Sequence, residues 1–251
     1  MIEAVQPTQQ GASVYNRSTY ERYFKSTPMN NTQREYPRMS VNKLGEYITA
    51  LPGRRKTIIK QQKRPQPFIV PYYRAAEDII VDYLTSSSDN EDWLELKIEE
   101  LSSKSTTSDW DETRRNICID ALDSFRELVE ELNFQGLSCT KGDPAPQKLD
   151  VAGVQISVRP EVYLSDSKGN AKGCIKLVFG KRRELQESEA GYIGTCLQEW
   201  MGKAHGVSDY KSCFVLDIFG EKRHVAPRAY VKRMQDITAA CEEISRAWDN
   251  A

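Results

Sequence analysis

The stretch GVQISVRPEVYLSDSKGNAKGCIKLVF, residues 153–179, decides the fold predicted for this chain. Residues 154–158 and 161–165 read as strands, and a Lys168-Gly169-Asn170 turn separates the second from the apolar run 174–179. That run is apolar enough to be a central strand. The stretch therefore predicts strands in close succession, in which Glu161 opens one strand and Lys176 lies within the next.

Amphipathic helices flank this stretch on both sides. Over 109–133, Ile117, Ala121, Phe125 and Leu128 recur every three to four residues, and Ser108 can cap the helix. The same kind of spacing predicts helices over 41–51, 54–62, 71–84, 91–101, 184–202 and from 227 towards the C-terminus. Further strands are predicted over 149–151 and 212–219.

These elements predict an α+β fold with a helical N-terminal region. Residues 1–40 are rich in Gln, Asn, Ser and Thr and lack a sustained period, so we expect a flexible tail that docks onto a protein partner. A Ser/Thr-rich break over 102–108 separates a helical region, 41–105, from an α/β domain, 106–251. The sequence does not specify an oligomeric state.

Composition excludes several classes of protein and of chemistry. No apolar run approaches the roughly 20 residues of a membrane helix, and the N-terminus lacks the pattern of a secretory signal. The six cysteines form no CxxC pair, which favours reduced thiols and a cytoplasmic protein. There is no P-loop, GxGxxG or GxSxG motif, and neither histidine lies near a cysteine motif that would suggest zinc.

Charge is distributed unevenly although the net charge is only −1. Residues 41–76 carry eight basic side chains and one acid, whereas 89–131 carry fourteen acids and five basic side chains. The candidates for phosphate contact are Arg54, Arg55, Lys56, Lys60, Lys63, Arg64, Lys181, Arg182 and Arg183. Tyr72 and Tyr73 could stack on unpaired bases. The alternatives are a solvated helix face for the basic residues and core packing for the tyrosines.

The order helix, strands, helix, strand over 109–219 resembles the core of the PD-(D/E)xK nuclease superfamily, including its RecB-like exonucleases. Pro160-Glu161 matches the first signature with Glu in place of Asp, and Lys176 matches the lysine of the acid-x-lysine triplet. Glu131 flanks the apolar face of the preceding helix. The resemblance implies an αβββαβ restriction-endonuclease-like core followed by a C-terminal helix.

The resemblance also implies a site for Mg²⁺ or Mn²⁺. Glu161, Glu131 and Asp150 are its candidate ligands, and Lys176 with Glu161 is the candidate catalytic pair, the lysine orienting the attacking water. The sequence departs from the family at Cys174, which stands where the triplet has its acid, and a thiol suits Mg²⁺ poorly. A replacement acid could come from Glu187 or Glu189.

Each candidate also has a structural interpretation. Glu161 could be a strand-edge acid paired with Arg159 or Lys172, and Lys176 could point outward from its strand. The sequence thus indicates a nucleic-acid-processing protein, with metal-dependent phosphodiester hydrolysis as one form. The alternatives are a catalytically degenerate binding or assembly module of a larger defence or repair complex, and an interaction protein whose basic segment meets an acidic protein surface.

Overall fold

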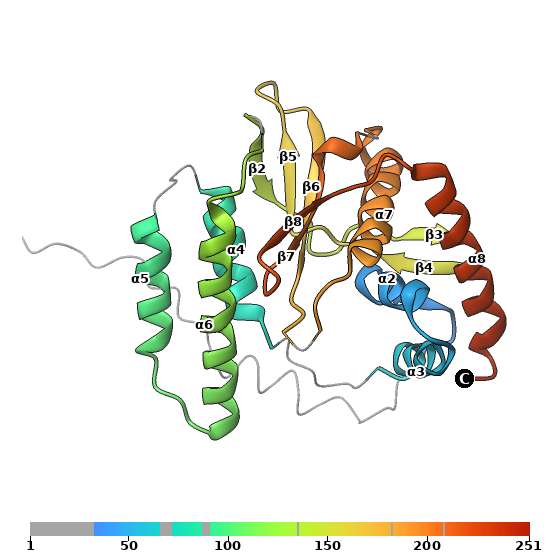
Figure 1. Ribbon diagram of the computed structural model, residues 1–251, viewed down its shortest axis with the longest axis horizontal. Coiled ribbons are helices and arrows are strands. Elements are labelled where there is room, and N and C mark those ends of the chain that lie inside the picture. Colours follow the sequence, from blue (N-terminus) through green and yellow to red (C-terminus); the bar gives the residue numbers. More distant parts are fainter. Residues whose placement is uncertain (1–32, 66–71, 87–90, 135, 182, 208) are drawn as a thin grey trace, which may run out of the picture. The chain divides into compact units, whose positions relative to one another are not determined.

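A computed structural model describes residues 33–65, 72–86, 91–134, 136–181, 183–207 and 209–251. Residues Gln33–Ala251 form one compact unit. Its described residues form helices and two mixed sheets, which confirms the α+β prediction (Figure 1). Most of the predicted tail, residues 1–32, lies outside the described residues.

The helices are α2 (Val41–Thr49), α3 (Pro52–Lys63), α4 (Arg74–Thr85), α5 (Glu91–Ser102), α6 (Asp109–Val129), α7 (Glu187–His205) and α8 (Tyr230–Trp248). The strands are β1 (Arg38–Ser40), β2 (Ser138–Lys141), β3 (Leu149–Val151), β4 (Val154–Ser157), β5 (Val162–Ser165), β6 (Ala171–Val178), β7 (Cys213–Asp217) and β8 (Lys222–Val225). None of the helices in these ranges is long and apolar enough to cross a bilayer.

Side-chain caps fix the N-terminal ends of α2 and α6. The Ser40 hydroxyl accepts a hydrogen bond from the Lys43 amide at 3.3 Å, and α2 starts at the next residue. Ser108 does the same for α6 by accepting from the Asp111 amide at 3.2 Å. Gly206, at φ 69°, ends α7 in the left-handed region that glycine tolerates.

The five-stranded sheet has the order β2-β5-β6-β7-β8. Strands β2, β5 and β6 are antiparallel neighbours, and β7 lies parallel to β6 after the crossover through α7. The order α6-β2-β5-β6-α7-β7 is therefore the αβββαβ arrangement that was expected. Its first strand is β2, which the sequence did not predict. The predicted strands 149–151 and 154–158 belong instead to a separate three-stranded sheet of order β1-β4-β3.

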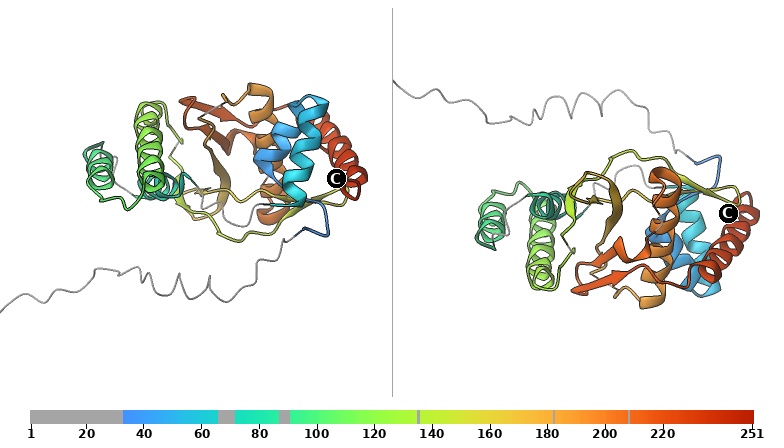
Figure 2. Two further views of the ribbon diagram at one scale, coloured as in Figure 1. Left: turned by 90° about the horizontal axis from the view of Figure 1, so that it is seen from below. Right: turned by 90° about the horizontal axis from the view of Figure 1, so that it is seen from above.

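Both faces of the central strands β6 and β7 are buried. On β6, Ile175 and Leu177 pack in the apolar cluster beneath α4, α5 and α6. Cys174 and Val178 point to the other cluster, which contains residues of α2, α3, α7 and α8. Figures 1 and 2 show these two groups of helices on opposite sides of the strands. Lys176 is two residues from both Cys174 and Val178, so its side chain leaves the strand on the same face as theirs.

The N-terminal elements are built into this unit rather than set apart from it. Helices α2 and α3 share an apolar cluster with α7 and α8, so the boundary expected near residue 105 separates no independent helical region. The tail prediction does not hold for Arg38–Ser40, which forms β1 and pairs in parallel with β4. Met39, at its centre, is fully buried.

Candidate functional site

Glu161 and Lys176 meet on neighbouring strands. The register pairs Val162 with Ile175, which places Glu161 opposite Lys176 on one face of the sheet. The Lys176 ammonium contacts Glu161 Oε1, and the Leu177 amide donates to Glu161 Oε2 at 2.7 Å. The side chains are 6% and 11% exposed for Glu161 and Lys176, respectively. The structure thus brings the predicted carboxylate and ammonium together as a buried ion pair.

The structural interpretations of these two residues do not hold. Lys176 does not point to solvent, because its ammonium also donates to the Arg159 carbonyl at 2.9 Å. Lys172 pairs with Asp166 at 3.2 Å instead of with Glu161. The backbone carbonyl of Arg159 accepts from Lys176, whereas the Arg159 guanidinium lies next to a different acid.

That other acid is Glu77, a site residue that sequence reasoning missed. It lies in the first turn of α4, where Arg159 Nη2 is 3.5 Å and Arg74 Nη1 is 3.4 Å from its Oε1. Burial raises the pKa of Glu77, and the negative charge of Glu161 raises it further. Nothing in the local sequence links Glu77 to the strands, because only tertiary packing brings α4 to the start of β5.

The other acids proposed as metal ligands do not join this cluster. Glu131 is exposed just beyond the end of α6, and Asp150 is exposed on β3 in the smaller sheet. Glu187 is exposed, while Glu189 is buried and paired with Arg183. Within the described ranges, no three His, Cys, Asp or Glu side chains gather as a metal-binding group. The three-ligand set Glu161, Glu131 and Asp150 is therefore not assembled.

Cys174 does not replace the missing acid. Its side chain is fully buried, and its register partner on the neighbouring strand β7 is Cys213. Burial and the neighbouring Cys213 thiol raise the pKa of Cys174 well above its usual value, which keeps it protonated. Two carboxylates, Glu77 and Glu161, thus remain as hard oxygen donors beside Lys176. They fit the smaller set of one or two carboxylates that Mg²⁺ accepts when waters and substrate phosphate complete its shell.

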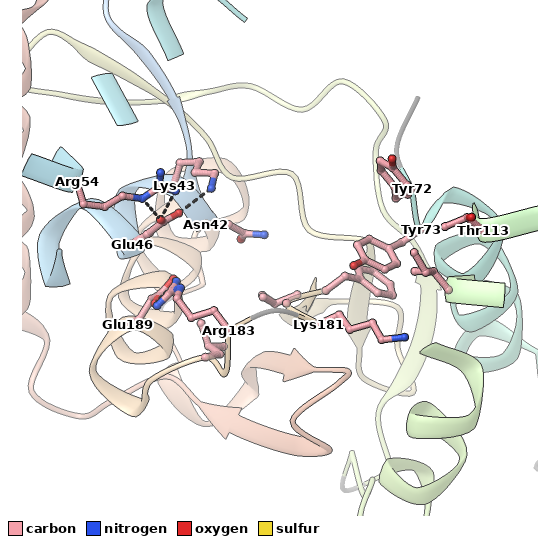
Figure 3. A pocket seen from close by; sticks show the side chains of 15 residues that line it. Asn42, Lys43, Glu46, Arg54, Tyr72, Tyr73, Thr113, Lys181, Arg183 and Glu189 are labelled. Atoms are coloured by element: carbon pink, nitrogen blue, oxygen red, sulfur yellow. Dashed lines mark hydrogen bonds and ion pairs between the residues drawn. The ribbon is translucent and has the colours of Figure 1, made fainter. Parts of the chain in front are cut away.

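A pocket of about 850 Å³ opens where β6 ends (Figure 3). We call it the basic pocket. Its charged lining residues are Lys43, Glu46, Arg54, Lys181, Arg183 and Glu189, and its aromatic ones are Tyr72, Tyr73 and Phe179. Val178, the last residue of β6, also lines it. The structure thus unites Arg54, Lys181 and Arg183, which were predicted to contact phosphate, with the two tyrosines proposed to stack on bases.

The acids of the basic pocket hold its cations in place. Glu46 accepts from Lys43 Nζ at 2.6 Å and lies 2.6 Å from Arg54 Nη2. Although burial opposes it, hydrogen bonding to these two cations lowers the pKa of Glu46. Arg183 Nη2 lies 2.8 Å and 2.7 Å from the two oxygens of Glu189, whose pKa burial nevertheless raises. Lys181 contacts Asp120 on α6. Four cations against two acids leave the lining positive.

The other predicted phosphate contacts divide into two groups. Arg55 donates to the carbonyls of Tyr47, Ile48 and Ala50 at 2.9–3.1 Å and so closes the end of α2. Lys63 is buried and donates to the carbonyls of Trp248 and Asp249 at the end of α8. These two residues have structural roles. Lys56 and Lys60 are exposed on α3, and Arg64 is exposed directly after it, whereas Arg182 lies outside the described residues.

Lys63→Met is expected to reduce stability and leave nucleic-acid binding unchanged. The substitution removes two hydrogen bonds from a charged donor to the buried end of α8, at a cost of about 1.5–3 kcal/mol. Lys60→Met, on the same helix but exposed, is the matched control and should change stability by less than about 0.5 kcal/mol. Urea denaturation followed by circular dichroism measures the stability of both variants. Equal stability of the two variants would contradict a structural role for Lys63.

No protein-family model matches this chain, and no curated protein matches its sequence.

Proposed function

We propose that this protein processes nucleic acid, binding it through the basic pocket and acting on it at Glu77, Glu161 and Lys176. One observation carries the proposal: β6 serves both places. Lys176 of this strand meets Glu161, which directly precedes β5, and Val178, two residues later on the same face of β6, lines the basic pocket. A backbone held by Arg54, Lys181 and Arg183 would therefore pass close to the buried carboxylate and ammonium.

The chemistry of the cluster suits a phosphodiester. The Lys176 ammonium is a fixed positive charge in a poorly hydrated place, where it can stabilise charge that develops on phosphate oxygens. Its contact with Glu161 and the 2.7 Å bond from the Leu177 amide orient that carboxylate. Glu77 and Glu161 are the residues that would hold Mg²⁺ or Mn²⁺, which would supply polarisation of the phosphate and an activated water.

A specific observation favours the second candidate, a catalytically degenerate binding or assembly module. Cys174 is buried beside Cys213, and both oxygens of Glu161 already have protein partners. In that case the basic pocket would still bind nucleic acid, and the chain that precedes β1 would supply contacts to a protein partner. The six cysteines are free thiols, which supports our expectation of a reducing, cytoplasmic location.

A cleavage assay separates these candidates. Single- and double-stranded DNA and RNA are incubated with the protein and Mg²⁺ or Mn²⁺, and Glu161→Gln and Lys176→Gln are compared with the unaltered chain. We expect cleavage that falls by about 10²-fold or more in each variant, because each loses a charge of the cluster. Cleavage that survives in both well-folded variants would exclude this site. Binding without cleavage would support the degenerate module.

The salt dependence of binding tests the nucleic-acid interaction itself. Arg54→Gln and Lys181→Gln should each make the slope of log K against log salt shallower by about one, since each removes one phosphate contact. Lys203→Gln is the matched control, because Lys203 is exposed at the end of α7 away from Glu189. Salt-insensitive binding would instead indicate that the basic residues of 53–64 contact a protein partner.

A further inference from the structure

We infer that the basic pocket takes an unpaired nucleotide of a single strand, with its base against Tyr72 and its phosphates on the cationic side. This inference rests on the proposed function and names the form of nucleic acid that the pocket accepts. Its basis is the arrangement of the lining side chains: Lys43, Arg54 and Arg183 lie with their acids on one side of the pocket, whereas Tyr72 and Tyr73 lie on the other, where Lys181 also extends (Figure 3).

On the charged side, the cations are more exposed to solvent than the acids. The side chains of Lys43, Arg54 and Arg183 are 38–51% exposed, whereas those of Glu46 and Glu189 are only 12% and 4% exposed. Lys181, 44% exposed, lies on the side of the tyrosines and contacts Asp120 of α6. Because the exposed part of each cation faces solvent, a cation can contact an arriving phosphate while it stays paired with its acid. The buried acids hold the cations in position before the ligand arrives.

On the aromatic side, Tyr72 offers a ring to a ligand. The residue is 39% exposed, and its ring meets that of Trp110 edge-on with centroids 6.0 Å apart. Next to it, Tyr73 stacks on Phe179, with centroids 5.0 Å apart and ring planes at 11°. This stacked pair gives the wall a rigid backing, and Tyr72 is the ring left accessible for a base.

The pocket also contains an amide that can read a base edge. Asn42 projects from α2 into the pocket, and its Oδ1 is buried with no hydrogen-bond partner among the described residues (Figure 3). A buried carbonyl oxygen that accepts no hydrogen bond is costly, and the Watson–Crick edge of an unpaired base can supply a donor to it. In a duplex that edge is already occupied by the complementary base.

The volume of the pocket agrees with this ligand. About 850 Å³ lies within the range of roughly 300–1,000 Å³ that small-molecule sites occupy, which suits one or two nucleotides and not a double helix. Charge on one side and an aromatic ring on the other match the two parts of a nucleotide. Single-strand binding commonly combines such a cationic path with stacking rings.

The test is fluorescence anisotropy with a labelled single-stranded oligonucleotide, the matching blunt duplex and a labelled mononucleotide. We expect Tyr72→Ala to weaken single-strand binding by about 5- to 100-fold while leaving the salt slope unchanged, because stacking is lost and charge is not. Tyr72→Phe should stay within about twofold of the unaltered chain. Tyr36→Ala is the matched control, since Tyr36 is exposed outside the pocket.

The outcomes separate this inference from the proposed function. Equal affinity for strand and duplex, or unaltered binding by a folded Tyr72→Ala variant, overturns the inference and leaves nucleic-acid binding in place. Should Tyr72→Ala fail to fold, Asn42→Ala serves instead, with the same expected loss of single-strand preference. A mononucleotide that binds as tightly as the strand would overturn the inference in favour of a free nucleotide. Absence of all nucleic-acid binding overturns the proposed function as well.

Discussion

Lys176→Met is expected to lower the free energy of unfolding by about 3–5 kcal/mol. The substitution keeps the apolar length of the side chain but leaves the Glu161 carboxylate, 6% exposed, without its cation. Removing one partner of a buried ion pair costs this much because the remaining charge is poorly solvated. Urea denaturation followed by circular dichroism at neutral pH measures the loss.

The double variant Glu161→Leu/Lys176→Met is the decisive comparison. Replacing both charges with apolar groups removes the unpaired charge, so much of the lost stability should return. A double variant as unstable as Lys176→Met would show that packing around β5 and β6, and not charge pairing, makes Lys176 necessary. The stability of Glu161→Gln also guides the cleavage assay, because only variants that remain folded inform on chemistry.

Gly173→Ala is expected to destabilise the protein by about 3 kcal/mol or more. A Cβ at this position would lie 1.8 Å from the carbonyl oxygen of Ser212 and 2.5 Å from its carbonyl carbon. Backbone atoms cannot swing aside as a flexible side chain can, so β6 would have to move away from the chain that enters β7. The parallel pairing that begins at Cys174 and Cys213 would be strained next to the substitution.

Gly53→Ala is the matched control for this prediction. Gly53 lies in α3, and a Cβ there would meet nothing within 4 Å. Alanine favours a helix over glycine, so stability should stay equal or rise by up to about 1 kcal/mol. If both alanine variants unfold at the same urea concentration, the close approach of Gly173 to Ser212 does not limit stability.

Sequence patterns predicted most helices because each depends on residues three or four apart. They also predicted that Glu161 and Lys176 would meet. The Asp166 carboxylate accepts from the Lys168 and Asn170 amides at 2.9 and 3.0 Å, which closes a tight turn between β5 and β6. A short hairpin brings the two strands together in one register, so two residues of the right parity share a face.

The missed strands lacked the signal that such reasoning needs. Strand β2, with the sequence SCTK, is mostly exposed at the sheet edge and belongs there only because it pairs with β5. Strand β8, with the sequence KRHV, is equally polar and pairs only with β7 among the described strands. Three-residue β1 pairs with β4, more than a hundred residues later. No alternation of buried and polar residues marks strands of this kind.

The amino-acid sequence by itself thus determined the helices, the β5–β6 hairpin and the meeting of Glu161 with Lys176, because neighbours along the chain encode all three. Only the tertiary structure decided that Glu77 joins this pair, that Lys63 closes α8 and that Arg54 and Lys181 share a pocket with Tyr72. A side chain's solvent exposure and partners depend on whichever distant segment packs against it. The spacing of residues along the local sequence does not predict which distant segment that is.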